Sequence, residues 1–372
     1  MTKLKTGLVG TGNVAHMHAA ALRTLPESEF VAVCGRPSEK RRAFAARYGV
    51  REFSEVGEMI ERAGVEALCV CTPHPNHAAS VIAAARAGVH TLVEKPLASS
   101  LADCDAMIAA AEAGKAVIAV VSQRRFYPPC RRIRRALDAG LLGRPVLGTA
   151  TIFGWRDEAY YQSGPWRGTW EGEGGGILVN QAPHPIDLLL WYMGEVAELT
   201  GYWANLNHPY IEVEDTAVAA IRFRSGALGS ILFSNSQNPA IHARLSVHGS
   251  GGASVGVQTD GGAMFVAGVT KDVEAPFVDL WTIRGEEDRI PQWKEEDAAF
   301  FRSVDPINYF HRLQIEDFLR AVIEGRPPAV SAAEGRRVVE VFTAIYRSSR
   351  DGKSVKFPVP PGRAEAPAIR PA

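Results

Sequence analysis

Two short stretches of the chain carry side chains suited to proton transfer. Glu94-Lys95-Pro96 follows an apolar run, and an ammonium at Lys95 would favour negative charge developing on a nearby oxygen. His184 and Asp187 stand three residues apart, so one helix would present both on the same face, where a carboxylate orients an imidazole. Each stretch also has a structural alternative: a solvated turn for the first, and a hydrogen-bonded histidine at a helix start for the second.

The residues before Lys95 predict a parallel β-sheet that presents it at one edge. Such sheets bind ligands beyond the carboxyl ends of their strands, and residues 90–95 have the apolar character of a strand buried on both faces. Strands and helices alternate through the first third of the chain, which indicates a doubly wound Rossmann sheet. After a short first strand and helix, strands are expected at residues 30–34, 67–72, 90–95 and 116–121, and helices at residues 76–88 and 99–114.

A glycine-rich turn near the start of the chain predicts a dinucleotide site. A short strand runs into Gly10-x-Gly12-x-x-Ala15, and an alanine-rich helix follows at once. Gly10 allows the tight turn, Gly12 lets a pyrophosphate approach the backbone, and Ala15 keeps the helix close to the strand. The helix N-terminus, with Asn13 and Val14, would bind the phosphates through unpaired N–H groups. The alternative is a tight turn without a ligand.

The residues after the second strand bear on the choice between NAD and NADP. An NAD-binding domain usually places an acidic residue there against the ribose 2′-hydroxyl, whereas this chain has Gly35, with Arg36 and Lys40 nearby. The missing carboxylate and the two cations favour NADP. Alternatively, Arg36 stacks on the adenine of either cofactor and Lys40 is a solvated helix residue.

Further cofactor contacts are expected past the ends of two other strands. Thr72-Pro73-x-x-Asn76-His77 follows a buried strand and opens a helix, so these four residues should line the crevice near the nicotinamide ribose. Gln123 follows the sixth strand and is expected at the same edge. Taken alone, His77 would be assigned to the surface.

The second half of the chain predicts a different kind of sheet. Short strands separated by glycine turns argue for an α+β domain with an open, largely antiparallel sheet. They are expected at residues 145–153, 216–223, 228–235, 243–249 and 264–269. The predicted domains are residues 1–123 for dinucleotide binding, residues 124–356 for substrate binding and oligomerisation, and residues 357–372 as a proline-rich tail that is mobile or forms an arm.

Aromatic side chains cluster in the loop before His184. Tyr160, Tyr161 and Trp166 stand among glycine and arginine residues, a mixture in which ring faces cover sugar C–H surface while polar groups bind hydroxyls. A hydrophobic core or an oligomer interface is an equal alternative. Asn180 lies one turn before His184, so it is expected to share its helical face and to bind the substrate.

The composition excludes several classes of protein. Lys and Arg together number 41, as do Asp and Glu, so no overall field attracts nucleic acid or an anionic membrane. No apolar run approaches the ~20 residues of a membrane span, and the start lacks a signal-peptide pattern. The five cysteines show no metal spacing and are expected as buried free thiols. We therefore expect a cytoplasmic protein without a metal.

Four motifs in register resemble the Gfo/Idh/MocA family, whose members are NAD(P)-dependent oxidoreductases acting mostly on sugars, inositols and their derivatives. They are the glycine turn, Thr72-Pro73-x-x-Asn76-His77, Glu94-Lys95-Pro96, and Gly174-Gly175-Gly176 followed by His184-x-x-Asp187. The resemblance spans roughly residues 4–355. It implies a Rossmann domain and a second domain whose sheet pairs subunits, hence a homodimer or homotetramer.

The resemblance also implies residue roles. Lys95 would bond the reacting oxygen, His184 would take the hydroxyl proton, and Asp187 would position His184. Asn180 departs from the family pattern, because many members have Asp there; a carboxamide binds substrate but takes no proton, so the role of base falls more heavily on His184. By the same resemblance, the cofactor-binding residues also include Glu94, Lys95, Trp166 and Arg167, and the substrate-binding residues include Lys95, Asn180, His184, Tyr160, Tyr161, Trp166 and Tyr309.

These expectations combine into one hypothesis with two rivals. The chain would transfer a hydride between NADP or NAD and a secondary alcohol of a sugar, anhydrosugar or inositol. The first rival is a glycoside-cleaving enzyme that uses tightly held NAD(P) in a transient oxidation. The second is a non-catalytic dinucleotide sensor, against which the presence of both Lys95 and His184 argues.

Overall fold

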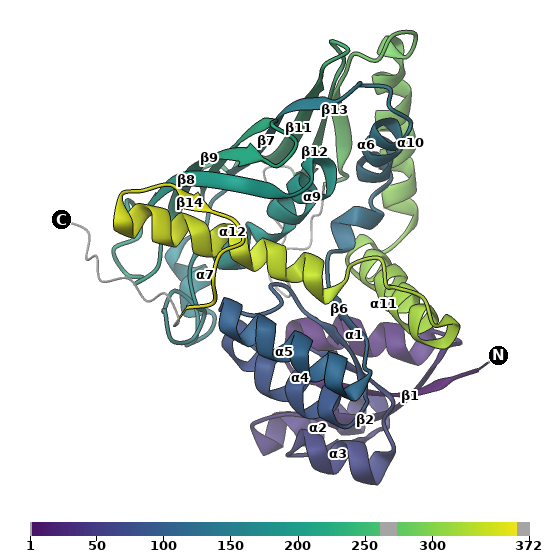
Figure 1. The fold of residues 1–372 in the computed structure, drawn as a ribbon. Helices are drawn as coiled ribbons and strands as arrows, with labels where there is room; N and C mark the ends of the chain where they lie inside the picture. Colours follow the sequence, from purple (N-terminus) through teal and green to yellow (C-terminus); the bar gives the residue numbers. More distant parts are fainter. Residues whose placement is uncertain (1, 261–273, 363–372) are drawn as a thin grey trace. The chain divides into compact units, whose positions relative to one another are not determined.

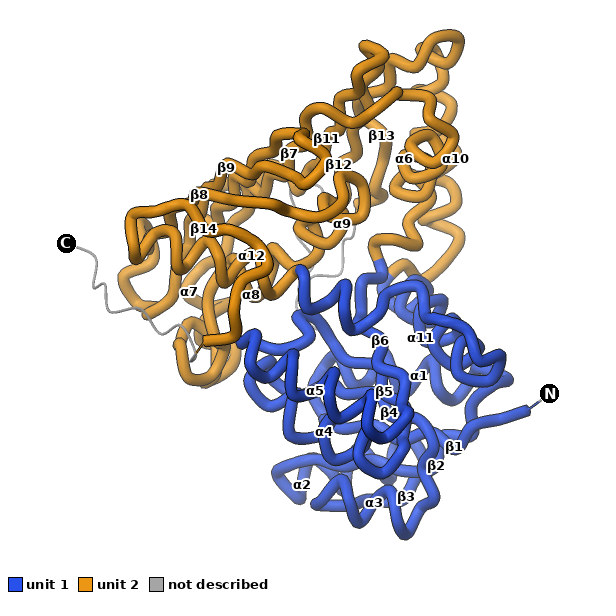
Figure 2. Tube along the Cα trace, viewed as in Figure 1, with its two compact units in different colours: residues 1–123, 307–337 blue, residues 124–306, 338–372 orange. Residues whose placement is uncertain are grey.

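The computed structural model describes residues 2–260 and 274–362, which fall into two compact units (Figures 1 and 2). The first unit takes its residues from 1–123 and 307–337, and the second from 124–306 and 338–372. The strand expected at residues 264–269 lies outside the described residues. None of the described helices is long and apolar enough to cross a membrane.

The first unit is built on a six-stranded parallel sheet. Its strand order is β3-β2-β1-β4-β5-β6, so the direction of winding reverses between β1 and β4, where such sheets bind ligands. This confirms the predicted Rossmann sheet. The strands are β1 Leu4–Val9, β2 Ser28–Cys34, β3 Arg51–Phe53, β4 Ala67–Val70, β5 His90–Val93 and β6 Ile118–Val120.

Helices cover the sheet because their apolar faces need a partner. Ala15, Ala19 and Leu22 of α1 lie in one buried cluster with the strand residues Leu8 and Val33. The helix α4 packs beside α5, whose first turn is capped by Ser100 (Figure 1). The helices of this unit are α1 Asn13–Thr24, α2 Ser38–Tyr48, α3 Val56–Ala63, the 3₁₀ turn η1 His74–Asn76, α4 His77–Arg86, α5 Leu101–Gly114 and most of α11 Pro306–Glu324.

Residues 307–337 join the first unit, although the sequence analysis assigned them to the second domain. Phe318 and Leu319 of α11 lie in the core of the Rossmann sheet. Gln314 completes the backbone of the last strand: its Nε2 donates to the Val120 carbonyl at 2.7 Å, and its Oε1 accepts from Ser122 N–H at 2.8 Å. The difference arises because apolar periodicity shows that α11 is amphipathic but not which core it covers.

The second unit contains an eight-stranded sheet with the order β13-β12-β11-β7-β10-β9-β8-β14. Neighbouring strands are antiparallel except β7 and β10, which confirms the predicted open, largely antiparallel sheet. The strands are β7 Pro145–Phe153, β8 Val196–Ala204, β9 Thr216–Phe223, β10 Leu228–Ser234, β11 His242–Gly249, β12 Ser254–Asp260, β13 Phe277–Trp281 and β14 Val355–Lys356.

One face of this second sheet is covered by helices, with α9 packed on β7 and β11. Residues 357–362, predicted as the start of a tail, are fixed against this unit: Phe357 N–H donates to the Ala197 carbonyl at 2.9 Å, and Val359 is buried. The helices are η2 Gln123–Phe126, α6 Pro128–Asp138, α7 Glu158–Gln162, α8 Ile177–Asn180, α9 Pro183–Met193, η3 Glu287–Arg289, α10 Ile290–Ser303 and α12 Ala332–Asp351, which begins in the first unit.

Candidate active site

The glycine turn between β1 and α1 has the shape that a dinucleotide phosphate needs. Gly10 has a φ of 113°, and a Cβ there would lie 2.5 Å from the Cys71 carbonyl oxygen, so only glycine fits. A Cβ at Gly12 would meet no atom within 4 Å, which leaves open space in front of the helix. Gly12 caps α1 without a side-chain hydrogen bond, and the helix begins at Asn13 and Val14, so the positive end of its dipole lies at this space. These residues fit a bound pyrophosphate.

The end of β2 carries the residues predicted to select NADP. Arg36 forms an ion pair with Glu55 at 2.9 Å, and both side chains are largely exposed. Gly35 is held by its neighbours: its carbonyl accepts from Arg41 at 3.0 Å. Because an exposed ion pair of this kind is worth little, it leaves Arg36 able to turn toward a phosphate. Lys40 is exposed on α2, as the solvated alternative also expects.

The loop after β4 differs from the prediction at His77. Its imidazole is fully buried, with Nε2 2.9 Å from the Thr72 carbonyl oxygen and Nδ1 3.0 Å from that of Pro96. Burial lowers the pKa of His77. The ring therefore ties the loop after β4 to the loop after β5, which is a correction to its predicted contact with the cofactor. Thr72, Pro73 and Asn76 remain at the strand end where they were expected.

A buried ion pair lies directly before Lys95. Glu94 follows β5, and its Oε1 accepts from His18 Nε2 on α1 at 2.8 Å, while its Oε2 accepts from the Lys95 backbone N–H at 3.2 Å. Burial alone would raise the pKa of Glu94, but the hydrogen bond and charge of His18 outweigh it and lower the value to about 2. Burial opposes the charge on His18 as well, yet contacts with Cys71, Cys69 and Glu94 raise its pKa well above 6.5.

The glycine run before α8 is fixed by a second buried carboxyl group. Glu214 is fully buried and accepts from Gly176 N–H at 3.0 Å and from Leu178 N–H at 2.9 Å. Tyr346 of α12 donates its hydroxyl to Glu214 Oε1 at 2.9 Å. Burial raises the pKa of Glu214 to about 7, against these hydrogen bonds. A Cβ at Gly176 would lie 1.9 Å from the Glu214 carbonyl oxygen, so the close approach requires glycine.

Asn180 and His184 are not on one continuous helix, contrary to the prediction. Asn180 is the last residue of α8, and His184 is the second residue of α9, with Gln181 and Ala182 between the two helices. Two prolines in the first turn of α9, Pro183 and Pro185, remove the N–H groups that a continuous helix would use. His184 is buried, at 8% exposure.

Asp187 forms a two-point ion pair with Arg125. Its Oδ2 accepts from Arg125 Nε at 2.8 Å and its Oδ1 from a terminal nitrogen of the same guanidinium at 2.6 Å, with both side chains buried. The guanidinium carbon also lies 5.3 Å from the centroid of the Trp191 ring. Asp187, which the sequence analysis assigned to His184, therefore binds Arg125, and this ion pair holds η2 to α9.

Tyr160 stands at the centre of the aromatic loop. Its phenol oxygen accepts from Arg167 at 2.6 Å, from Asn180 Nδ2 at 3.0 Å and from Gln181 Nε2 at 3.3 Å. The Arg167 guanidinium lies over the Tyr160 ring at 4.3 Å and over Trp166 at 4.4 Å. The loop thus joins Tyr160, Arg167 and Asn180, three of the predicted site residues, by direct contacts.

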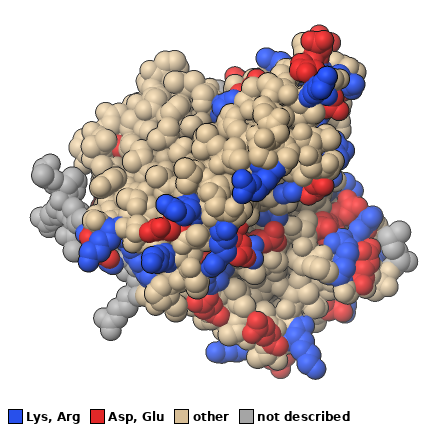
Figure 3. Space-filling view, turned by 45° about the horizontal axis from the view of Figure 1, so that its top comes forward, with Lys and Arg blue, Asp and Glu red and all other residues tan. Residues whose placement is uncertain are grey.

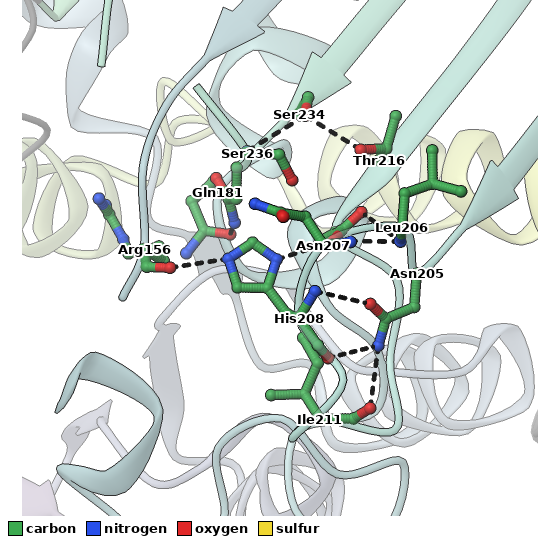
Figure 4. A network of polar contacts seen from close by, with 12 residues as sticks. Arg156, Gln181, Asn205, Leu206, Asn207, His208, Ile211, Thr216, Ser234 and Ser236 are labelled. Carbon is green, nitrogen blue, oxygen red and sulfur yellow. Dashed lines mark hydrogen bonds and ion pairs between the residues drawn. The ribbon is translucent and has the colours of Figure 1, made fainter. Parts of the chain in front are cut away.

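A polar network centred on His208 contacts the start of this loop at Arg156 (Figure 4). His208 places Nδ1 2.7 Å from Asp215 and Nε2 2.8 Å from the Arg156 carbonyl oxygen, and Figure 4 shows its ring between Arg156 and the segment containing Asn205. Burial opposes ionisation of Asp215, but hydrogen bonds from His208 and the backbone lower its pKa. Gln181 joins the network by accepting from Asn235 at 3.2 Å.

The remaining predicted residues are placed separately in the two units. Lys95 follows β5 in the first unit, half-buried, and Gln123 opens η2 after β6. Tyr309 lies on α11 in the first unit, edge-to-face with Phe310 at 5.3 Å. Tyr161 is buried in the second unit, edge-to-face with Tyr160 at 5.0 Å.

Four polar residues of the site were not singled out from the sequence: His18, Arg125, Glu173 and Glu214. Each is buried and acts through a hydrogen bond to a predicted site residue or to its helix. Charged residues are rarely buried unless they are paired, but a sequence does not reveal which of them are buried. Of these four residues, only His18 could have been recognised as buried from the sequence, because it lies on the apolar face of the helix after the glycine turn.

A doubly wound sheet with a phosphate cradle at its switch point, followed by a mostly antiparallel α+β unit, is the architecture of a dinucleotide-dependent oxidoreductase. The family model for an oxidoreductase family with an NAD-binding Rossmann fold matches residues 4–122, and that for the GFO/IDH/MocA C-terminal domain matches residues 130–255. The chain belongs to the Gfo/Idh/MocA family.

Relatives extend the match over nearly the whole chain. The myo-inositol 2-dehydrogenase of Thermotoga maritima is 27% identical over 359 residues, covering 95% of this chain and 98% of the relative. The scyllo-inositol 2-dehydrogenase (NAD(+)) of Bacillus subtilis is 26% identical, covering 96% and 97%. The WlbA dehydrogenase of Bordetella pertussis, solved with NADH and UDP-GlcNAcA, is 30% identical with a TM-score of 0.85, covering 96% and 99%.

These matches confirm the predicted family, the fold class and the nicotinamide dinucleotide as cofactor. They also confirm that the chain is an oxidoreductase. The preference for NADP over NAD stays a prediction, as do the roles of the individual site residues.

Proposed function

We propose that the chain is an NAD(P)-dependent dehydrogenase or reductase that acts on a secondary alcohol or ketone of a sugar, anhydrosugar or inositol. The observation that carries this is the glycine cradle at the switch point of a parallel sheet, in a chain whose two halves both match the family. The names of the relatives, inositol dehydrogenases and a dehydrogenase solved with UDP-GlcNAcA, support a polyhydroxylated substrate.

Each site residue then has a task that its chemistry suits. When bound, the dinucleotide supplies or accepts the hydride. Gly10 and Gly12 would admit its pyrophosphate, and the start of α1 would hold the charge. Lys95 would donate a hydrogen bond to the reacting oxygen, where a positive charge favours alkoxide character. His184 would accept the hydroxyl proton, and Asp187, held by Arg125, would orient His184.

A screen of substrates with both cofactors tests the proposal. Sugars, anhydrosugars and cyclitols, assayed in both directions with NAD(H) and NADP(H), should give a change in nicotinamide absorbance for at least one polyol. The Arg36→Ala variant should weaken binding of NADP more than of NAD, because only NADP carries the 2′-phosphate. Tighter binding of NAD by the wild-type protein would refute the NADP preference. Release of an aglycone without net absorbance change would favour the glycoside-cleaving alternative.

We further propose that the open face of the second sheet pairs two copies of the chain. Tyr202, Val218 and Leu232 lie side by side in register on β8, β9 and β10, and they are 62%, 37% and 41% exposed. Figure 3 shows a broad area with few charged side chains on the face that it presents. An exposed apolar patch on a sheet is typical of a protein interface.

The Val218→Glu variant should therefore be monomeric. Light scattering coupled to gel filtration should give twice or four times the chain mass for the wild-type protein and the single mass for the variant, because a carboxylate in the middle of the face would be buried without a partner. The Ala83→Glu variant, which places a carboxylate on an exposed position of α4 in the first unit, is the control. A monomeric wild-type protein would contradict the proposal.

A further inference from the structure

The side-chain amide of Asn180 is held in one orientation. Its Nδ2 donates one hydrogen to the Tyr160 phenol oxygen at 3.0 Å and the other to Glu173 Oε1. An amide nitrogen has two hydrogens, so both are used within the unit. The reverse orientation would set Asn180 Oδ1 against Glu173 Oε1, with no hydrogen between the two oxygens. The contacts therefore set Nδ2, and not Oδ1, against Tyr160 and Glu173, so Oδ1 is turned away from these two partners and can only accept.

Glu173 is itself rigidly placed. It is 1% exposed, its Oε2 accepts from Gly168 N–H at 2.7 Å, and its own N–H donates to the Thr169 carbonyl at 3.0 Å. Both carboxyl oxygens thus accept hydrogen bonds from N–H groups, which is the pattern of an ionised carboxylate. Tyr160, the other acceptor for Asn180, is fixed by Arg167. The cluster combines α7, the glycine-rich loop and the end of α8.

We propose that Glu173 is a positioning residue, which turns the Asn180 carboxamide so that Oδ1 accepts a hydrogen bond from a substrate hydroxyl. This inference rests on the function proposed above. Asn180 then recognises a donor without taking its proton, in the position where many family members carry an aspartate. A keto group donates nothing to Oδ1, so the cluster favours polyols that offer a hydroxyl there. Position 180 of this chain has no carboxylate, but the buried carboxylate of Glu173 contacts Asn180 directly.

This arrangement makes the Asn180→Asp substitution unfavourable, although it restores the residue common in the family. An aspartate at this position would face the Glu173 carboxylate directly. Two carboxylates that share a site cannot both stay ionised cheaply, so the pair would keep a proton at neutral pH. A Glu173→Gln substitution added to it would remove the repulsion, because the glutamine Nε2 can donate to the new carboxylate. The double variant, in which the acid and the amide exchange places, should therefore lose less activity than either single variant.

The test is a double-mutant cycle measured as kcat/KM against pH. Asn180→Asp should lower kcat/KM at least about 10-fold at pH 7 and add an inflection above about pH 7, where the shared proton leaves. Glu173→Gln alone should lower it about 10-fold, mainly through KM, because glutamine lets the Asn180 amide turn either way. The double variant should return to within about threefold of the wild-type protein and lose the new inflection, a strong positive coupling.

Two results would overturn the proposal: an Asn180→Asp variant with unchanged rate and pH profile, or a double variant no better than the product of the two singles. If Glu173→Gln does not fold, the pH profile of Asn180→Asp decides alone. If the wild-type protein oxidises no polyol, the proposed function fails separately. The positioning role is then tested by NMR titration of carboxyl groups labelled with carbon-13, in which Asn180→Asp should show a raised carboxyl pKa that is absent from the double variant.

Discussion

The Lys95→Ala variant should lose at least about 100-fold in kcat while binding the dinucleotide with nearly unchanged affinity. Removing a group that stabilises charge only in the transition state typically has an effect of this size, about 2.7 kcal/mol or more. The dinucleotide cradle is formed by Gly10, Gly12 and the start of α1, which follow β1, whereas Lys95 follows β5. Steady-state kinetics and fluorescence titration with the reduced dinucleotide measure the two effects separately.

Two further variants make the Lys95 result specific. Lys3→Ala removes an exposed lysine from the same unit and should leave kcat unchanged. Lys95→Arg keeps the charge but replaces a compact ammonium with a planar fork, so it should recover only part of the activity. Turnover by Lys95→Ala equal to that of the wild-type protein would end the catalytic assignment.

The His18→Phe variant should lose about 3–5 kcal/mol of stability, because it leaves the Glu94 carboxyl group buried without its charged partner. Phenylalanine keeps most of the volume at this fully buried position, so the loss reports the broken pair. Urea unfolding at pH 6 measures it. Adding Glu94→Leu should recover most of the stability, since no unpaired charge then remains. A His18→Phe protein as stable as the wild type would contradict the pairing.

The contribution of the pair of His18 and Glu94 to the stability of the protein depends on pH. The lowered pKa of Glu94, about 2 against the usual 4.5, means that its contribution is present above pH 4.5 and is lost as the pH falls toward 2. The raised pKa of His18 means that its contribution is complete below pH 6.5 and is lost as the pH rises through the raised value. Relative to the His18→Phe/Glu94→Leu protein, the wild type should gain most from the pair between pH 4.5 and 6.5.

The sequence predicted those parts of the fold that depend on local pattern. β7 and β9 begin and end at the expected residues; buried side chains alternate with more exposed ones throughout β9, and in β7 from Leu147 onward. The glycine turn was predicted because Gly10 and Gly12 satisfy a steric need that acts within three residues. Lys95 was expected at a strand end because an apolar run stops just before it.

The parts that the sequence did not predict depend on contacts between distant residues. The ion pair between His18 and Glu94 joins positions 76 apart, and the pair between Arg125 and Asp187 joins positions 62 apart. His77 was assigned to the cofactor because strand ends bind ligands, but its ring turns inward and lies between two loop carbonyls. The break between α8 and α9 could have been expected from Pro183 and Pro185, which cannot continue a helix.

The discontinuous first unit has a consequence for biosynthesis. Its core requires Phe318 and Leu319, and its last strand requires Gln314, so the nascent chain cannot complete this core until α11 has left the ribosome. Every strand of the second sheet except β14 precedes α11 in the chain and is translated before it. A fragment that ends at Gln123 would expose the apolar surface that α11 covers, and should therefore aggregate rather than fold as a dinucleotide-binding module.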